Sequence, residues 1–212
     1  AASDVYKRQL LMSLQRIKPA KQGELDGACG FYAIVNAIHA LEPSLDKPEL
    51  FSQVLAAFLR DGDYMSYFNG TKRGTIKNTL SRVLNYLNSH FDMYHDKTQE
   101  LYEFDFSIPY WLNDTSRNRK QVLKQIAQAD NAKNCVCIVG YDHQTGGHWS
   151  VVKKVSDKGL HMLDSDNEKS IIPLDEIAID GSKKPRPSKP YRFTSEDIFV
   201  IRKKWHGEFR VL

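Results

Sequence analysis

The sequence predicts an α+β domain, because helical and strand patterns occupy different parts of the chain. Amphipathic segments with helical spacing cover 31–41, 48–59 and 75–87, whereas short apolar segments with strand character lie between 134 and 201. Apolar residues at i, i+3, i+4 and i+7 mark one face of a helix, and short apolar runs between turn residues mark strands. Segregated helices and strands favour an α+β arrangement over alternating βαβ units.

The length of 212 residues fits one domain. We expect it to span 12–212, with a mainly helical half at 12–130 and a mainly β half at 131–212. Residues 1–11 precede Met12, where a natural start would fall, and are interpreted as a possible non-native leader. The helical half should contain helices over Pro48–Leu59, over Thr75–Leu87 with Thr75 as N-cap, and over Ser116–Gln128.

The β half should contain five strands, and one further extended segment should precede it. The strands are centred on 136–139, 151–155, 160–163, 171–172 and 198–201, and part of 101–111 is also interpreted as extended. Cys135 and Cys137 alternate in the first strand and are expected to be small core residues. The Pro-rich basic segment 183–191 is interpreted as a solvated connector.

Charge, cysteine count and the length of the apolar segments argue against several classes of protein. A net charge of +4 with scattered basic residues gives no indication of nucleic-acid binding. Three cysteines are too few for a disulfide framework, and no segment has the length of a membrane span or the pattern of a signal peptide. We therefore expect a cytoplasmic protein without a membrane partner.

The first chemically distinctive residue is Cys29. It follows a turn-rich stretch with Gly23, Asp26 and Gly27 and opens the apolar helix of residues 31–41. The first turn of a helix has unpaired N–H groups and partial positive charge, and both stabilise a thiolate. Cys29 is therefore a candidate nucleophile, although a lone cysteine is often only a small buried hydrophobe.

The second is His148, which follows Gly146-Gly147 at the mouth of a predicted strand. The hairpin after it returns several polar residues toward the histidine, and the hairpin register decides which of them shares its face. A tight turn that pairs Val155 with Leu160 places Ser165 and Asn167 on the His148 side. A three-residue loop with Gly159 left-handed places Asp164 and Asp166 there. The sequence alone leaves both registers open.

Nucleophilic catalysis by a thiol needs a base to pair with it, a group to orient the base, and donors to the oxyanion. The Cys29 backbone N–H is one candidate donor and the Gln22 side-chain amide is a second. Cys29, His148 and Asp164 could also ligate zinc, but no further His or Cys stands at close spacing to complete a metal site. No cofactor is expected.

These residues together resemble the papain-like cysteine peptidase superfamily. The chain order matches that superfamily: Gln22 comes first, then Cys29 at a helix start, then His148 at a strand mouth, and then a polar residue after the next strand. The block GHWSVVKKVSDKGLHMLDS is similar to the hairpin of bacteriocin-processing peptidases and Josephin-type deubiquitinases. The resemblance implies a papain-like fold in which Cys29 is the nucleophile, His148 the general base and acid, Asp164 the orienting residue and Gln22 the oxyanion donor.

The resemblance also implies a function, a cytoplasmic thiol hydrolase that cleaves a peptide or isopeptide bond through a thioester. The substrate would be a peptide or protein, with a ubiquitin-like tail and a leader peptide both compatible. The same site could instead serve an acyltransferase or a deamidase, and the fold could serve as a catalytically silent binding module.

Overall fold

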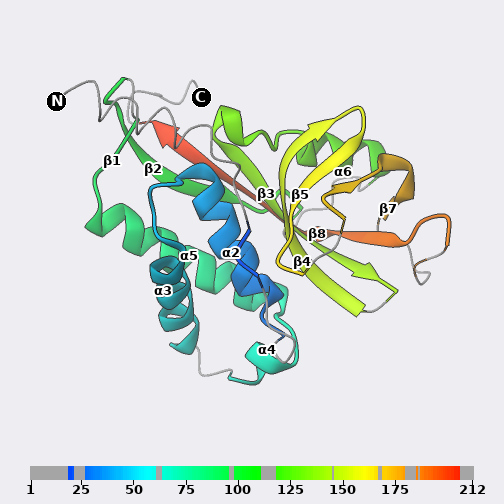
Figure 1. The fold of residues 1–212 in the computed structure, drawn as a ribbon, viewed down its shortest axis with the longest axis horizontal. Coiled ribbons are helices and arrows are strands. Elements are labelled where there is room, and N and C mark those ends of the chain that lie inside the picture. The colour runs from blue at the N-terminus through cyan, green and yellow to red at the C-terminus, as the bar shows by residue number, and fades with distance from the viewer. Residues whose placement is uncertain are drawn as a thin grey trace.

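The computed structural model describes residues 19–21, 27–60, 64–95, 98–110, 118–144, 146–166, 169–179, 185 and 187–205. Within them the chain forms an α+β fold, as predicted (Figure 1). The described helices are α2 (Cys29–Leu41), α3 (Lys47–Leu59), α4 (Met65–Phe68), α5 (Arg73–His90) and α6 (Arg119–Ile126). None of these helices is long and apolar enough to cross a membrane. The possible leader, residues 1–11, lies outside the described residues.

The described strands form one sheet. They are β1 (Met93–Tyr94), β2 (Leu101–Ser107), β3 (Cys135–His143), β4 (Gly146–Ser156), β5 (Gly159–Leu163), β6 (Ile171–Ile172), β7 (Ile177–Ile179) and β8 (Tyr191–Trp205). The order is β1-β2-β8-β3-β4-β5-β6, and neighbouring strands run antiparallel. Strand β7 lies off this path and pairs in parallel with the start of β8.

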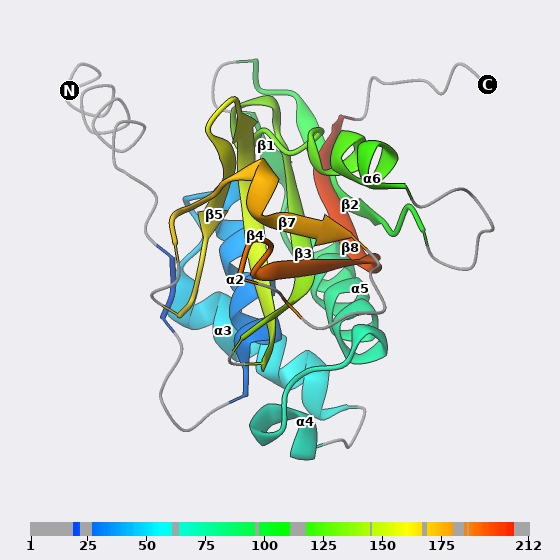
Figure 2. The ribbon, with the colours of Figure 1, turned by 90° about the vertical axis from the view of Figure 1, so that its right-hand side faces the viewer.

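Each face of the sheet has its own hydrophobic core. Helices α2, α3 and α5 pack on one face, together with strand residues such as Ile138 and Val151 (Figure 1). Helix α6 packs on the other face, where the alternate strand residues Cys137 and Val152 lie (Figure 2). Successive side chains of a strand point to opposite faces, so one set of strands supplies both cores.

Two helices begin where their first residues find partners. The Asp46 side chain accepts a 3.0 Å hydrogen bond from the Glu49 N–H and caps α3, within one residue of the predicted start. The prediction that Thr75 caps the next helix is wrong, because α5 already begins at Arg73. The Arg73 guanidinium bonds to Glu196 and to Asp197 on β8, and these contacts fix the start of the helix.

Strands are not confined to the second half of the chain. Strands β1 and β2 come from residues 93–107, between α5 and α6, and β2 pairs with the final part of β8. Strand β8 is also far longer than the predicted segment 198–201, because β3 pairs with it along most of its length, β7 pairs with its start and β2 pairs with its end. The predicted helix at 116–128 is present as α6, and its first two residues lie outside the described part.

Candidate active site

Cys29 is the first residue of α2, as the sequence predicted, and is 5% exposed. The turn before it is held by a hydrogen bond from the Gly27 N–H to the Tyr67 carbonyl, 2.8 Å. A Cβ atom on Gly27 would lie 2.5 Å from the Gly70 backbone nitrogen, so only glycine allows the segment after α4 to pass this closely. The helix that carries the thiol is thereby anchored to residues 67–70.

His148 lies near the start of β4, with its Cα opposite that of Tyr141 on β3. The next residue, Trp149, belongs to the core that covers α2, and its indole N–H donates to the Thr71 carbonyl at 2.7 Å. The His148 ring meets the Tyr141 ring edge-on, with centroids 5.5 Å apart. Helix α2 packs on β4, and this contact brings the beginning of the helix to the histidine (Figure 1).

The hairpin register follows neither predicted alternative throughout. Near the turn, Val155 pairs with Leu160, as in the tight-turn alternative. Farther along, Val152 pairs with Met162, so Lys153 is an extra residue in β4 and forms a bulge. The bulge changes the register by one residue and places Asp164, rather than Ser165, on the face of His148.

Asp164 and Cys29 both contact the His148 ring. The Nε2–H of His148 donates to the Asp164 carboxylate, 3.0 Å from Oδ2 and 3.2 Å from Oδ1. The Cys29 side chain hydrogen-bonds to the same ring, and Nε2 is already engaged, so Nδ1 is the nitrogen left for the sulfur. The structure thus brings Cys29 to two residues, His148 and Asp164, that lie more than a hundred positions farther along the chain.

The three side chains lie largely out of water. The exposed fraction is 13% for the His148 side chain and 5% for that of Asp164. Burial lowers the pKa of His148, but the hydrogen bonds and charges of Asp164 and Cys29 outweigh it and raise that pKa from 6.5 to about 10. Burial likewise raises the pKa of Asp164, and the His148 contact more than offsets this and leaves the pKa below 3.8.

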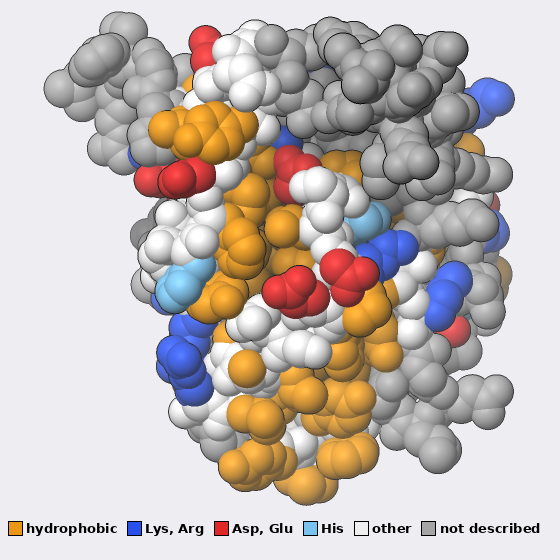
Figure 3. Space-filling model, turned by 60° about the vertical axis from the view of Figure 1, so that its left-hand side comes forward, with side chains coloured by type: hydrophobic (Ala, Val, Ile, Leu, Met, Phe, Trp, Pro, Cys, Tyr) orange, Lys and Arg blue, Asp and Glu red, His pale blue; other side chains and the backbone are white. Residues whose placement is uncertain are grey.

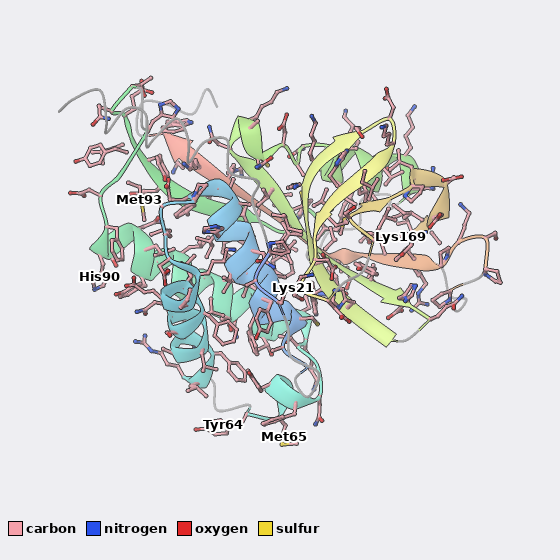
Figure 4. The ribbon with its side chains drawn as sticks, viewed as in Figure 1. Lys21, Tyr64, Met65, His90, Met93 and Lys169 are labelled. Atoms are coloured by element: carbon pink, nitrogen blue, oxygen red, sulfur yellow. The ribbon has the colours of Figure 1, made fainter. Side chains whose placement is uncertain are left out.

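The structure describes only some of the other residues that the sequence offered for the site. Ser165 is buried, and Asp166 is exposed but donates its backbone N–H to Asp164 Oδ1 at 2.8 Å. Asn167 and Gln22 lie outside the described residues, so the oxyanion role of Gln22 stays a prediction. Just before Gln22, the Lys21 ammonium lies 3.4 Å from the Asp164 carbonyl oxygen, and Figure 4 shows Lys21 beside the start of α2.

Two residues that the sequence did not single out also contact these three side chains. The Tyr141 hydroxyl lies 3.4 Å from Asp164 Oδ2, and the Ser150 hydroxyl hydrogen-bonds to both Asp164 and the Leu163 carbonyl. A hairpin interpretation of DHQTGG that pairs His143 with Gly146 would have placed Tyr141 opposite His148. The sequence could therefore have predicted that Tyr141 lies at the site. It could not have predicted the contact between Ser150 and Asp164, because that contact depends on the bulge at Lys153.

A surface of exposed hydrophobic side chains, the α4 surface, adjoins the thiol-bearing turn. It consists of Tyr64, Met65 and Phe68, whose exposed fractions are 61%, 59% and 62%. Tyr67, between them, faces inward and stacks on Phe31 of α2 at 6.1 Å. Figure 4 shows Tyr64 and Met65 at the lower edge of the molecule, and Figure 3 shows hydrophobic side chains gathered at the same level.

The described ranges offer little indication of a metal or a small ligand. In them, no group of three or more His, Cys, Asp or Glu side chains is arranged to hold a metal ion. A cavity of about 340 Å³ lies between α3 and α5, lined in part by Arg82, Tyr86 and His90, and none of the three triad residues lines it. Comparisons with protein families, with curated proteins and with solved structures find no match to the chain.

Proposed function

We propose that the protein is a thiol hydrolase that cleaves a peptide or isopeptide bond through a thioester at Cys29. The observation that carries the proposal is the His148 ring held between the Asp164 carboxylate and the Cys29 side chain at the start of α2. A nucleophile, a base and an orienting acid in hydrogen-bond contact are the arrangement that activates a thiol for acyl transfer.

The reaction would run in two halves. The Cys29 thiolate attacks the carbonyl carbon, and the tetrahedral intermediate collapses as the C–N bond breaks and the His148 imidazolium gives its proton to the leaving amine. Water then attacks the thioester while His148 takes a proton from it, and the carboxylic acid and the free thiol are released. Asp164 keeps the ring oriented and stabilises the imidazolium in both halves.

The raised pKa of His148, about 10, supports the first half, because the ring then carries its proton at neutral pH. An imidazolium next to a thiol favours the thiolate, and the first backbone N–H groups of α2 add partial positive charge at the same point. The Phe31 N–H bonds to the Ala28 carbonyl, whereas the first two N–H groups, those of Cys29 and Gly30, precede the first intrahelical hydrogen bonds and are suited to an oxyanion. Gln22 is the proposed second donor.

The α4 surface supports a polypeptide as substrate. Three large hydrophobic side chains are exposed on α4 and on the residue before it, and exposed patches of this kind are typical of interaction sites. The thiol lies 4.0 Å from the Gly27 carbonyl, and the Gly27 N–H bonds to Tyr67 of α4. The turn that carries the thiol is therefore joined directly to the backbone of α4.

The test uses a peptide library prepared from a digested cell lysate, with water or hydroxylamine as the acceptor. We expect new peptide termini in water and hydroxamates in hydroxylamine, and neither with Cys29→Ala or His148→Gln. Iodoacetamide should also alkylate Cys29 at pH 6 much faster than it alkylates a free thiol. An alkylation rate equal to that of a free thiol, together with no cleavage and no hydroxamate, would overturn the proposal.

A further inference from the structure

Tyr141 is a buried residue whose polar end points at the candidate site. It lies on β3, is 3% exposed, and its Cα is paired with that of His148. Its ring stacks on Phe193 with centroids 5.0 Å apart and meets Tyr191 edge-on at 5.6 Å. These aromatic contacts hold the ring in one orientation, and a buried phenol of this kind requires a hydrogen-bond partner for its hydroxyl.

The same side chain contacts two members of the triad. The Tyr141 hydroxyl lies 3.4 Å from Asp164 Oδ2, the oxygen that also accepts the 3.0 Å hydrogen bond from His148. The Tyr141 ring meets the His148 ring edge-on, with centroids 5.5 Å apart. The other carboxylate oxygen, Oδ1, accepts the backbone N–H of Asp166 at 2.8 Å. Donors at both oxygens therefore fix the rotation of the Asp164 carboxylate.

We infer that Tyr141 is a positioning residue that holds the Asp164 carboxylate ionised and the His148 ring tilted toward Cys29. This inference extends the proposed function, although the contacts that carry it involve no substrate. A hydroxyl that donates to a carboxylate in a buried site favours the charged form of the acid. Without that hydroxyl, Asp164 would take up a proton at a higher pH, and the imidazolium would lose its counter-charge there.

Two side-chain hydroxyls, that of Tyr141 and that of Ser150, hydrogen-bond to Asp164. His148 is its ion-pair partner, with Cys29 on the far side of that ring. The Lys21 ammonium approaches the backbone carbonyl of Asp164 rather than the carboxylate. Asp166 contributes its backbone N–H. Removal of the Tyr141 hydroxyl should therefore affect both the protonation of Asp164 and the hydrogen bond that it accepts from His148.

The first experiment measures the rate of Cys29 alkylation by iodoacetamide from pH 4 to 9, with labelled sites assigned by peptide mass. Tyr141→Phe removes the hydroxyl and keeps the ring, and Tyr191→Phe makes the same change in a ring that contacts Tyr141 and His143. We expect Tyr141→Phe to move the acid limb of the profile up by about half to one pH unit, which gives a loss of up to about 4-fold at pH 4 and little loss above pH 6. Tyr191→Phe should follow the wild type.

The second measurement does not depend on thiol reactivity. The Nε2–H proton of His148, assigned by its absence in His148→Gln, should give a downfield resonance in the proton NMR spectrum of the wild type. In Tyr141→Phe it should shift and exchange faster with water. An unchanged resonance, or an alkylation profile that superimposes on the wild type or falls equally at every pH, would overturn the role of Tyr141. A wild-type thiol of ordinary reactivity would refute the proposed function instead, and the NMR result would still decide on Tyr141.

Discussion

Replacing Asp164 with Asn is the sharpest perturbation of the candidate site, because it removes one charge and keeps the shape. The Asp164 contact is the main influence that opposes burial and raises the pKa of His148 from 6.5 to about 10. With a neutral amide there, burial would act unopposed by that charge and lower the pKa of His148. The ring would then be neutral at pH 6 to 7, and Cys29 would lose the cation that favours its thiolate.

The size of the effect follows from the chemistry of a free thiol. A thiol with a pKa of about 8.5 is ionised to roughly 0.3% at pH 6, so the largest possible loss in alkylation rate is about 300-fold. The dipole of α2 would remain in the variant, and we therefore expect a loss of about 30- to 300-fold at pH 6. At pH 9 a free thiol is mostly ionised, and the difference should shrink to a few-fold.

The assay is iodoacetamide labelling of Cys29, read by peptide mass at pH 6 and pH 9, with circular dichroism to verify folding. Asp166→Asn is the matched control, because the side chain of Asp166 is exposed and its contact with Asp164 is through the backbone N–H, which asparagine keeps. Asp166→Asn should label like the wild type. A folded Asp164→Asn protein that labels at the wild-type rate at pH 6 would refute the ion-pair reasoning.

Three other predictions concern His148, Gly27 and the α4 surface. The pKa of His148 is about 10 in the folded protein and near 6.5 in the unfolded chain, so its contribution to stability is complete below pH 6.5 and is lost as the pH rises toward 10. The difference in urea-unfolding free energy between the wild type and His148→Gln should therefore be smaller at pH 10 than at pH 6, by about 1 to 3 kcal/mol, and an equal difference at the two pH values would contradict the raised pKa. Gly27→Ala would put a Cβ against the backbone at 2.5 Å and should lower the unfolding free energy by about 1 to 3 kcal/mol and slow Cys29 alkylation, and equal stability would argue against the close approach. The pair Tyr64→Ser and Phe68→Ser should reduce peptide cleavage about 10-fold without changing alkylation of Cys29, while Tyr94→Ser, an exposed aromatic on β1, should change neither; unaltered cleavage in the α4 variants would exclude that surface from substrate binding.

The sequence could predict the elements of the site better than the way they meet. The position of Cys29 at a helix start was readable, because glycine turns give way to a long apolar period. The orienting residue was not readable, because alternation along β4 assigns faces only if the ladder is regular. The bulge at Lys153 breaks that regularity, and no residue type between Val152 and Lys154 marks it.

Errors at the start of α5 have a similar physical origin. Thr75 is a good N-cap by residue type, but the first turn of α5 is fixed from outside the helix by the bonds of Arg73 to Glu196 and Asp197. Those partners lie more than a hundred positions away, so local propensity could not include them. Where β8 pairs with β3, its register shifts between Ile198 and Phe193, and the intervening residues include both of these acids.

The contacts that assemble the site are the same contacts that join the helices to the sheet. Trp149 donates to Thr71 just before α5, and it is adjacent in the chain to His148. On the helix side, the segment that contains Thr71 continues from α4, whose Tyr67 carbonyl holds the turn before Cys29. The thiol and the imidazole are therefore each one or two residues from an anchor on the same stretch, 67–71. A change that loosens this stretch should alter the distance between sulfur and ring before it unfolds either half, so thiol reactivity should be a more sensitive measure of its packing than global stability.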